Sequence, residues 1–239
     1  MQDTLAREAA ARGLPLTDDQ LAQFDAYYRL LVEWNARFNL TRITEAEAVQ
    51  VQHFLDSLAL LAVAGEWFPH QAKVIDVGAG AGLPGLALKI ARPDLDVVLT
   101  DSVGKKVQFV DHVIGALGMT GARAVHARAE DLGRDRAYRE QFDVAVARAV
   151  ADLPVLAEYL LPLVKVGGAA LAQKGAGAAE EVARAAKAVR VLGGGAVSLA
   201  EYRLPGLDEA RAVVVMPKPH RTPPSYPRRA GLPAQQPIR

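Results

Sequence analysis

The residues that most clearly indicate chemistry lie between Val74 and Gly85, where a short apolar run gives way to a loop rich in glycine. The run, Lys73-Val-Ile-Asp-Val77, has the β-branched composition of a buried strand, and Leu86 opens a segment with helical spacing. The loop carries glycines at positions 78, 80, 82 and 85. Glycines let a ligand approach the main chain, and the start of the next helix offers free amide donors to an anionic group. The pattern predicts a cofactor pocket.

Two cofactors fit this loop. Gly80-x-Gly82-x-x-Gly85 satisfies the dinucleotide fingerprint, so a nicotinamide enzyme has to be weighed against an S-adenosylmethionine (SAM) enzyme. Asp76 lies on the strand two residues before the first glycine, and the resulting Asp-x-Gly-x-Gly-x-Gly resembles class I SAM-dependent methyltransferases. Together with a reversed strand expected late in the sheet, this resemblance favours SAM as the cofactor.

Later strand ends carry further polar residues. Asp101 follows the second strand, where an acid would accept hydrogen bonds from ribose hydroxyls, although it could instead cap the next helix. Ala129 and Glu130 follow the third strand, at the place where such enzymes hold the adenine edge; an exposed charge is the alternative for Glu130. Arg148 ends the fourth strand and could bind the SAM carboxylate or a substrate phosphate, or form a structural salt bridge.

The elements that would position these residues alternate between strand and helix. We expect an α/β fold of the class I SAM-dependent methyltransferase (Rossmann-like) type, with a seven-stranded doubly wound sheet, an antiparallel edge strand and additional N-terminal helices. The expected strands are residues 73–77, 96–100, 122–126, 141–148, 168–173, 197–204 and 212–216. The expected helices are residues 3–12, 18–38, 45–63, 86–91, 104–117, 153–164 and 178–191.

Three regions are predicted along the chain. Residues 1–65 form an N-terminal helical extension packed on the core, in which Trp34 and Phe38 pack inward and His53 and Asp56 share one helix face, in a mutual hydrogen bond or in packing. Residues 66–217 form the SAM-binding domain. Residues 218–239 form a basic, proline-rich tail.

The tail is expected either to be solvated or to contact RNA. Seven prolines between positions 217 and 239 forbid a helix or a central strand, and the segment holds five Lys and Arg residues but no acid. Cations with an aromatic side chain suit a phosphate backbone and a stacked base. The predicted RNA contacts are Arg221, Tyr226, Arg228 and Arg229.

Composition excludes several classes of function. The 239 residues include no cysteine, which rules out disulfides, thiolate metal sites and a cysteine nucleophile, and no metal site is expected. Lys and Arg number 28 against 27 acids, so net charge alone does not indicate nucleic acid. The N-terminus lacks the pattern of a signal peptide, and no apolar run reaches the length of a membrane span. We expect a cytoplasmic protein without a membrane partner.

Missing motifs also narrow the methyl acceptor. Methylation at carbon 5 of a pyrimidine normally needs a cysteine nucleophile. Adenine amine methylation usually shows Asp or Asn-Pro-Pro-aromatic after the fourth strand, where this chain has Ala147-Arg-Ala-Val150, and no convincing Lys-Asp-Lys-Glu set for ribose methylation is found. A ring nitrogen such as guanine N7 has an exposed lone pair and no proton, so it can attack in line without a general base once it is positioned.

The ordered motifs resemble the small-subunit ribosomal RNA methyltransferase G family, also called glucose-inhibited division protein B, over nearly the full length. These motifs are Leu31-Val-Glu-Trp-Asn35 with Phe38-Asn-Leu-Thr41, His53-x-x-Asp-Ser-Leu58, Asp76 to Gly85, Arg128-Ala-Glu130, Ala147-Arg-Ala149, Lys174-Gly175 and Tyr226-Pro-Arg-Arg-x-Gly-x-Pro233. The resemblance implies a bacterial enzyme that transfers the SAM methyl to N7 of one guanosine in the 530 loop of 16S rRNA. Its partner would be 16S rRNA or the 30S subunit rather than DNA, and we expect a monomer.

The resemblance also implies most of the site. With Gly80 of the loop added, the predicted cofactor contacts are Gly78, Gly80, Leu83, Asp101, Ser102, Val103, Ala129, Glu130 and Arg148. Leu83 stands where phenylalanine is most often expected, a change that keeps an apolar wall. We expect Arg148 and Lys174 to be the charged groups of the catalytic site, with structural ion pairs as the alternative. Two other functions stay open: a small-molecule methyltransferase, and an RNA-binding protein that has lost SAM.

Overall fold

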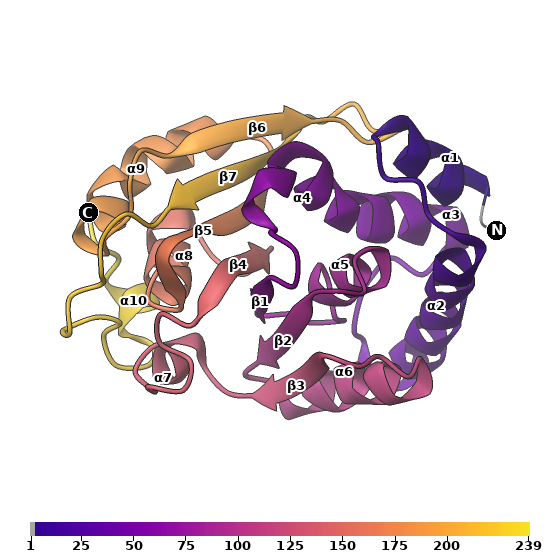
Figure 1. Ribbon diagram of the computed structural model, residues 1–239, viewed down its shortest axis with the longest axis horizontal. Coiled ribbons are helices and arrows are strands. Elements are labelled where there is room, and N and C mark those ends of the chain that lie inside the picture. The colour runs from indigo at the N-terminus through magenta and orange to yellow at the C-terminus, as the bar shows by residue number, and fades with distance from the viewer. Residues whose placement is uncertain (1–2) are drawn as a thin grey trace.

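The structure is a computed structural model that describes residues 3–239. Seven strands form one sheet in the order β3-β2-β1-β4-β5-β7-β6 (Figure 1). The strands are β1 (Lys73–Val77), β2 (Asp96–Asp101), β3 (Ala122–His126), β4 (Phe142–Arg148), β5 (Val164–Lys174), β6 (Ser198–Tyr202) and β7 (Arg211–Pro217). The helices along the sheet are α5 (Gly85–Ala91), α6 (Gly104–Ala116), α7 (Ala129–Leu132), α8 (Leu153–Leu160) and α9 (Ala178–Val191).

The sheet confirms the expected fold class. Strands β1 to β5 pair in parallel, because each connection passes through a helix or a long crossover, whereas β7 pairs antiparallel with both β5 and β6. The expected hairpin of the last two strands is therefore present, with the reversed strand β7 one position inside the edge and β6 at the edge. The carboxyl ends of the five parallel strands lie along one side of the sheet, where α/β enzymes bind their ligands.

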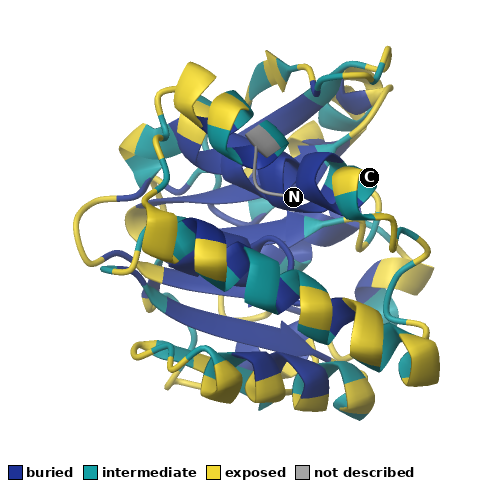
Figure 2. Cartoon of the chain, turned by 90° about the vertical axis from the view of Figure 1, so that its right-hand side faces the viewer, coloured by how far each residue is buried: buried dark blue, intermediate teal, exposed yellow. Residues whose placement is uncertain are grey.

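Successive side chains along each strand point to opposite faces of the sheet, so the protein has two apolar cores, one on each face. Val74, Val146 and Leu171 face the N-terminal helices, α5 and α6, while Ile75 and Ala145 face α8 and α9. Figure 2 shows the buried side of the covering helices turned toward the sheet and their exposed side toward solvent. The N-terminal helices are α1 (Asp3–Ala11), α2 (Asp18–Phe38), α3 (Ala46–Val49) and α4 (Asp56–Ala64).

The N-terminal helices follow the sequence prediction closely. Thr17 caps α2 through a full capping box with Gln20, and Asn39 ends the helix in a left-handed conformation. The helix expected over residues 45–63 is present but contains a π-helical turn, η1 (Gln50–Leu55), and continues into a 3₁₀ turn, η2 (Gly65–Trp67). The stretch Ala46–Trp67 is long and apolar enough to cross a membrane by composition, yet 72% of its most apolar window is buried within the protein, as is typical of a core helix.

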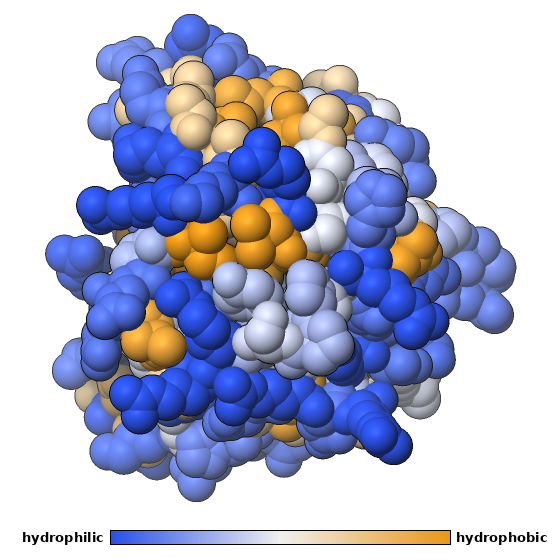
Figure 3. Space-filling view, turned by 90° about the vertical axis from the view of Figure 1, so that its left-hand side faces the viewer, coloured by the Kyte–Doolittle hydropathy of each residue, from blue (hydrophilic) through white to orange (hydrophobic). Residues whose placement is uncertain are grey.

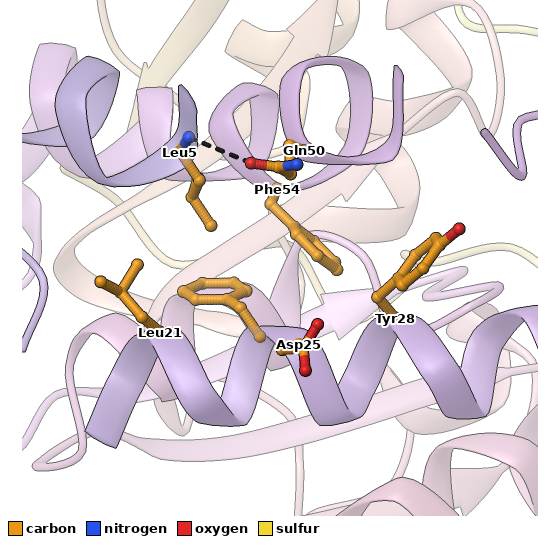
Figure 4. A pocket seen from close by; sticks show the side chains of 7 residues that line it. Leu5, Leu21, Asp25, Tyr28, Gln50 and Phe54 are labelled. Atoms are coloured by element: carbon orange, nitrogen blue, oxygen red, sulfur yellow. Dashed lines mark hydrogen bonds between the residues drawn. The ribbon is translucent and has the colours of Figure 1, made fainter. Parts of the chain in front are cut away.

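The packing between α1, α2 and η1 leaves a small hollow, drawn in Figure 4. Leu5, Phe24 and Phe54 line it, and the Leu5 amide donates to Gln50 Oε1 at 3.2 Å. The cavity volume is about 10 Å³, which is room for no more than one water molecule. We interpret this hollow as a packing defect of the apolar core.

Two boundaries differ from the prediction. Helix α8 was expected to run to Val164 but ends at Leu160, and β5 was expected to begin at Gly168 but begins at Val164. The apolar residues Leu161 to Val164 fit the core equally well in either conformation, so hydrophobicity could not place the boundary. The expectation of strands over 197–204 and 212–216 is met within one to two residues by β6 and β7.

The C-terminal segment, residues 218–239, is packed rather than solvated, which corrects one of the two readings given above. Lys218 is only 1% exposed, and its ammonium donates to the carbonyls of Leu161 and Val164 at 2.7 and 3.0 Å. Burial lowers the pKa of Lys218 to about 8. Prolines were also expected to forbid a helix, but one turn, α10 (Leu232–Gln235), forms because a proline is tolerated at the start of a helix.

Arginines of the main domain hold the backbone of this segment. Arg139 donates to the carbonyls of Tyr226 and Thr222 at 2.7 and 2.8 Å, and Arg134 donates to the Pro227 carbonyl at 2.9 Å. Arg228 pairs with Glu158 of α8, a side chain that is 1% exposed, through contacts as short as 2.6 Å. The Arg228 guanidinium, predicted to bind RNA, is therefore engaged inside the protein.

Arg228, which is paired with a buried carboxylate, and its exposed neighbour Arg229 allow a direct test of the ion pair. Arg228→Met should lower the free energy of unfolding by about 3 kcal/mol, because the buried Glu158 carboxylate loses its cationic partner. Arg229 is exposed, so Arg229→Met should change it by less than about 0.5 kcal/mol. Urea unfolding followed by circular dichroism measures both values, and equal effects of the two substitutions would contradict the assigned ion pair.

Candidate functional site

A cavity of about 370 Å³ lies at the carboxyl ends of the parallel strands. Its lining comes from the ends of β1, β2, β3 and β4, from α8 and from the C-terminal segment. This volume falls within the range of about 300 to 1,000 Å³ that small-molecule sites occupy. The lining residues are Val77, Gly78, Thr100, Asp101, Ser102, Val103, Lys106, Ala127, Arg128, Ala129, Glu130, Ala149, Val150, Ala151, Tyr159 and Ala234.

The glycine loop is held from below by Asp76. This carboxylate is fully buried, and its Oδ2 accepts the Gly85 amide at 2.7 Å, which closes the loop onto the start of α5. Its Oδ1 has no hydrogen-bond partner among the residues that the structure describes. Burial raises the pKa of Asp76 to about 7, against the lowering effects of the Gly85 amide and of Arg148. A second contact comes from α2, where the buried Tyr27 hydroxyl donates to the Ala81 carbonyl.

Asp101 joins two walls of the cavity. Its Oδ2 accepts the Gly80 amide at 3.0 Å, and its Oδ1 accepts the Val103 amide at 2.9 Å just before α6. The Lys106 ammonium lies 3.7 Å from Oδ2. The helix-start role, which was the alternative for Asp101, is therefore present. The role of ribose acceptor stays a prediction, which the second lone pair of each carboxylate oxygen allows.

The Glu130 carboxylate also accepts a backbone amide. It is only 3% exposed, and its Oε1 accepts the amide of Gly231 from the C-terminal segment at 2.8 Å. The alternative of an exposed charge is thus wrong for Glu130. Its neighbour Arg128 is exposed and lines the cavity, a residue that the sequence reasoning did not select although it directly precedes Ala129.

Arg148 turns away from the cavity lining, toward the N-terminal helices. Its guanidinium donates to Asp56 Oδ2 at 3.0 Å and to the Gln52 carbonyl at 3.1 Å. Asp56 is fully buried and also contacts Arg211 at 3.3 Å and the Tyr202 hydroxyl at 2.7 Å. The structural ion pair, which was the alternative for Arg148, is therefore present, and a role in binding or catalysis stays a prediction.

His53 and Asp56, which were expected to share one helix face, bond different partners. A ring nitrogen of His53 lies 2.9 Å from Thr41 Oγ1, while Asp56 serves the arginine cluster. Burial, together with Arg148, lowers the pKa of His53 to about 4, so the imidazole is neutral at physiological pH. Trp34 packs inward as expected and contacts Phe109 of α6. Phe38 is only half-buried: its ring contacts that of Trp34, with centroids 5.4 Å apart, and the Lys105 ammonium lies over it.

Lys174 holds the segment that follows β4. Its ammonium donates to the Ala151 carbonyl at 2.6 Å and pairs with Glu181 at 2.7 Å, and Glu181 in turn accepts the Leu153 amide at 2.9 Å. The segment carries Ala149 at a φ of 55° and presses Val150 against Gly78. A side chain at Gly78 would lie 2.7 Å from Val150. Lys174 was predicted to be catalytic; here it is bonded within a wall of the cavity.

The structure thus brings together six of the nine predicted cofactor contacts. Gly78, Asp101, Ser102, Val103, Ala129 and Glu130 line the cavity. The other three predicted contacts, Gly80, Leu83 and Arg148, lie outside that lining. The Gly80 amide is bonded to Asp101, and Leu83 is buried in the core. Sequence reasoning did not select the other lining residues, which are Val77, Thr100, Lys106, Ala127, Arg128, Ala149, Val150, Ala151, Tyr159 and Ala234.

Comparison with known proteins identifies the family. The family model for rRNA small subunit methyltransferase G matches residues 20–206. The chain is 46% identical to the ribosomal RNA small subunit methyltransferase G of Desulforamulus reducens, covering 98% of this chain and 97% of the relative. It is 47% identical to the protein of the same name from Moorella thermoacetica, with the same coverage.

The chain belongs to the rRNA small subunit methyltransferase G family. Solved structures support the same fold at low sequence identity. A protein of Methanococcus maripaludis assigned as a SAM-dependent methyltransferase superposes with a TM-score of 0.57 at 13% identity, over 73% of this chain and 90% of that one. Precorrin-6y C5,15-methyltransferase of Geobacter metallireducens gives 0.50 at 12% identity, over 76% and 91%. These structures show the fold, while the family match identifies the chain as a methyltransferase, with SAM as its methyl donor.

The cavity fits that cofactor. The glycine loop opens onto it at Gly78, Asp101 offers its remaining lone pairs, and a side chain added at Gly80 would find no atom closer than 3.9 Å. Small or flat residues, Ala127, Ala129 and Tyr159, line the end beyond β3. These residues would hold the cofactor's polar and planar parts, while Lys174 and Asp101 keep the surrounding loops in place.

Lys174 can be tested as a positioning residue. Lys174→Met should weaken SAM binding by about tenfold, the equivalent of one charge-assisted hydrogen bond, because the Ala149–Ala151 wall loses its hold. Glu181→Gln should have a smaller effect in the same direction, and Lys174→Arg should restore part of the affinity. Calorimetry measures SAM affinity, and an unchanged affinity combined with a lower kcat would instead assign Lys174 a direct role in catalysis.

Proposed function

We propose that this enzyme transfers the methyl group of SAM to N7 of a guanosine in the 530 loop of 16S rRNA. The observation that carries the proposal is the family match, since the relatives that match nearly the full length are named for methylation of small-subunit ribosomal RNA. The cytoplasmic location, the monomeric state and the absence of a DNA partner belong to the same proposal.

The side chains of the cavity favour an acceptor that needs no deprotonation. Both lining carboxylates, Asp101 and Glu130, already accept backbone amides, and Lys174 and Arg148 are held in ion pairs. SAM supplies an electrophilic methyl group on a sulfonium centre when it is bound. Guanine N7 presents a lone pair without a proton, so in-line attack requires only that the base be positioned. The chain's contribution is therefore orientation rather than general base catalysis.

The charges near the cavity suit a polyanionic acceptor. Arg128 is exposed at the lining, and Lys106 of α6 also lines the cavity. Arg229 of the C-terminal segment is exposed, as is Arg221, which lies outside the lining beside Gly193. Such cations contact phosphates and fix the register of an RNA, whereas contacts to bases select the nucleotide. Tyr226 packs partly against the core beside α8, which leaves less of its ring available for stacking than a free tail would.

The packing of residues 218–239 changes how the small-molecule alternative can be tested. Deleting the tail would have separated the two functions if the tail were solvated. Because Lys218, Thr222 and Pro227 are buried, a deletion would also damage the core. The acceptor has to be identified by the product instead.

Reaction with labelled SAM provides that test. We expect 30S subunits or 16S rRNA that lack the modification to gain one methyl group on a single guanosine of the 530 loop. Strand scission specific to N7-methylguanosine should map it, and 50S subunits serve as the control substrate. Methyl transfer to a base amine or to ribose would contradict the N7 assignment. No transfer to either RNA by protein that binds SAM would contradict the proposal as a whole.

A further inference from the structure

The C-terminal segment reaches the cofactor cavity. Ala234 of α10 lines it together with Tyr159 of α8 and Ala129 of α7. Figure 1 shows α10 beside α7 and α8 in space. In sequence, Ala234 is distant from the other residues that line the cavity. Ala234 is exposed, so its side chain borders the cavity from the solvent side rather than from the core. Figure 3 shows that this side of the protein is mixed, with hydrophobic patches near its centre and top among hydrophilic side chains.

Two contacts fix the segment just before α10 begins. Arg228 pairs with the buried Glu158 of α8, and the Gly231 amide donates to the buried Glu130 at the cavity. Gly231 has a φ of +82°, a conformation that glycine adopts without strain and that directs the chain into α10. Pro233 is buried and stiffens the turn. The position of Ala234 is thus set by carboxylates of the main domain.

The chemistry of this wall suits a planar, weakly polar group. Tyr159 offers an aromatic ring, and Ala129 and Ala234 offer small apolar side chains. Asp101, the acceptor suited to ribose hydroxyls, borders the same cavity at the end of the neighbouring strand β2. A methyl group at position 234 leaves room where a longer side chain would fill the cavity.

We propose that residues 228–235 form part of the SAM site, with Ala234 contacting the adenosyl moiety of the cofactor. The segment that the sequence predicted either to be solvated or to contact RNA therefore serves the cofactor, with Arg229 exposed to solvent and Ala234 at the cavity. The inference rests on SAM as the cofactor and is independent of which acceptor is methylated.

A series at one exposed position tests the wall. Ala234→Leu and Ala234→Trp should weaken SAM binding progressively, with the tryptophan reducing affinity by about tenfold or more because it occupies cavity volume. Gln236→Trp is the matched control, since Gln236 is also exposed, lies two residues away and is outside the cavity lining. Calorimetry with SAM alone gives the affinities, and thermal unfolding without SAM reports the fold.

The expected result is graded loss of SAM affinity in the Ala234 variants, with an unchanged unfolding temperature and with affinity retained in Gln236→Trp. Wild-type affinity in Ala234→Trp would overturn the proposal. So would an equal loss in Gln236→Trp, which would indicate a general disturbance of the segment. If Ala234→Trp unfolds at a lower temperature than the wild type, Ala234→Leu takes its place, and wild-type SAM affinity in that variant would overturn the proposal. Because no RNA is present, failure here leaves the proposed acceptor untouched.

Discussion

Hydrogen bonds from backbone amides to three buried carboxylates hold the walls of the cofactor cavity together. Asp76 accepts the amide of Gly85, Asp101 accepts those of Gly80 and Val103, and Glu130 accepts that of Gly231. Burying a carboxylate is costly unless donors surround it, so each acid fixes the loop that supplies its donor. One oxygen of Asp76 has no hydrogen-bond donor among the described residues, and burial raises the pKa of this carboxyl to about 7.

A further buried carboxylate, Asp56, ties the N-terminal helices to the same end of the sheet. It contacts Arg148 of β4, Arg211 of β7 and Tyr202 of β6, so four elements meet at one side chain. Removing one arginine would leave the other to neutralise Asp56, whereas removing Asp56 would leave two cations facing each other. The N-terminal helices are therefore coupled electrostatically to the strand ends that build the site, as well as packed on the apolar face.

Local patterns in the sequence predicted most of the fold and much of the site. Alternating strands and helices, the Thr17 cap and the glycine loop after Asp76 are short-range signals, and the structure follows them. Contacts between distant segments carried no such signal. Nothing near Ala234 indicates that it borders a cavity formed around residue 129, and the Arg228 to Glu158 pair joins residues 70 positions apart. Charge and proline content described the C-terminal segment correctly as basic, but they could not show that buried acids would bind it.

Hydrogen exchange measured by NMR on the SAM-free protein tests the central claim, that carboxylates preorganise the cavity walls. The amides of Gly80 and Gly231, which precede helices, and of Gly85, the first residue of α5, have no partner within a helix, yet they should exchange slowly because carboxylates accept them. Gly206 in the exposed turn between β6 and β7 should exchange fast. Fast exchange of all three carboxylate-bound amides, comparable to that of Gly206, would contradict the claim and would mean that the walls form only when the cofactor binds.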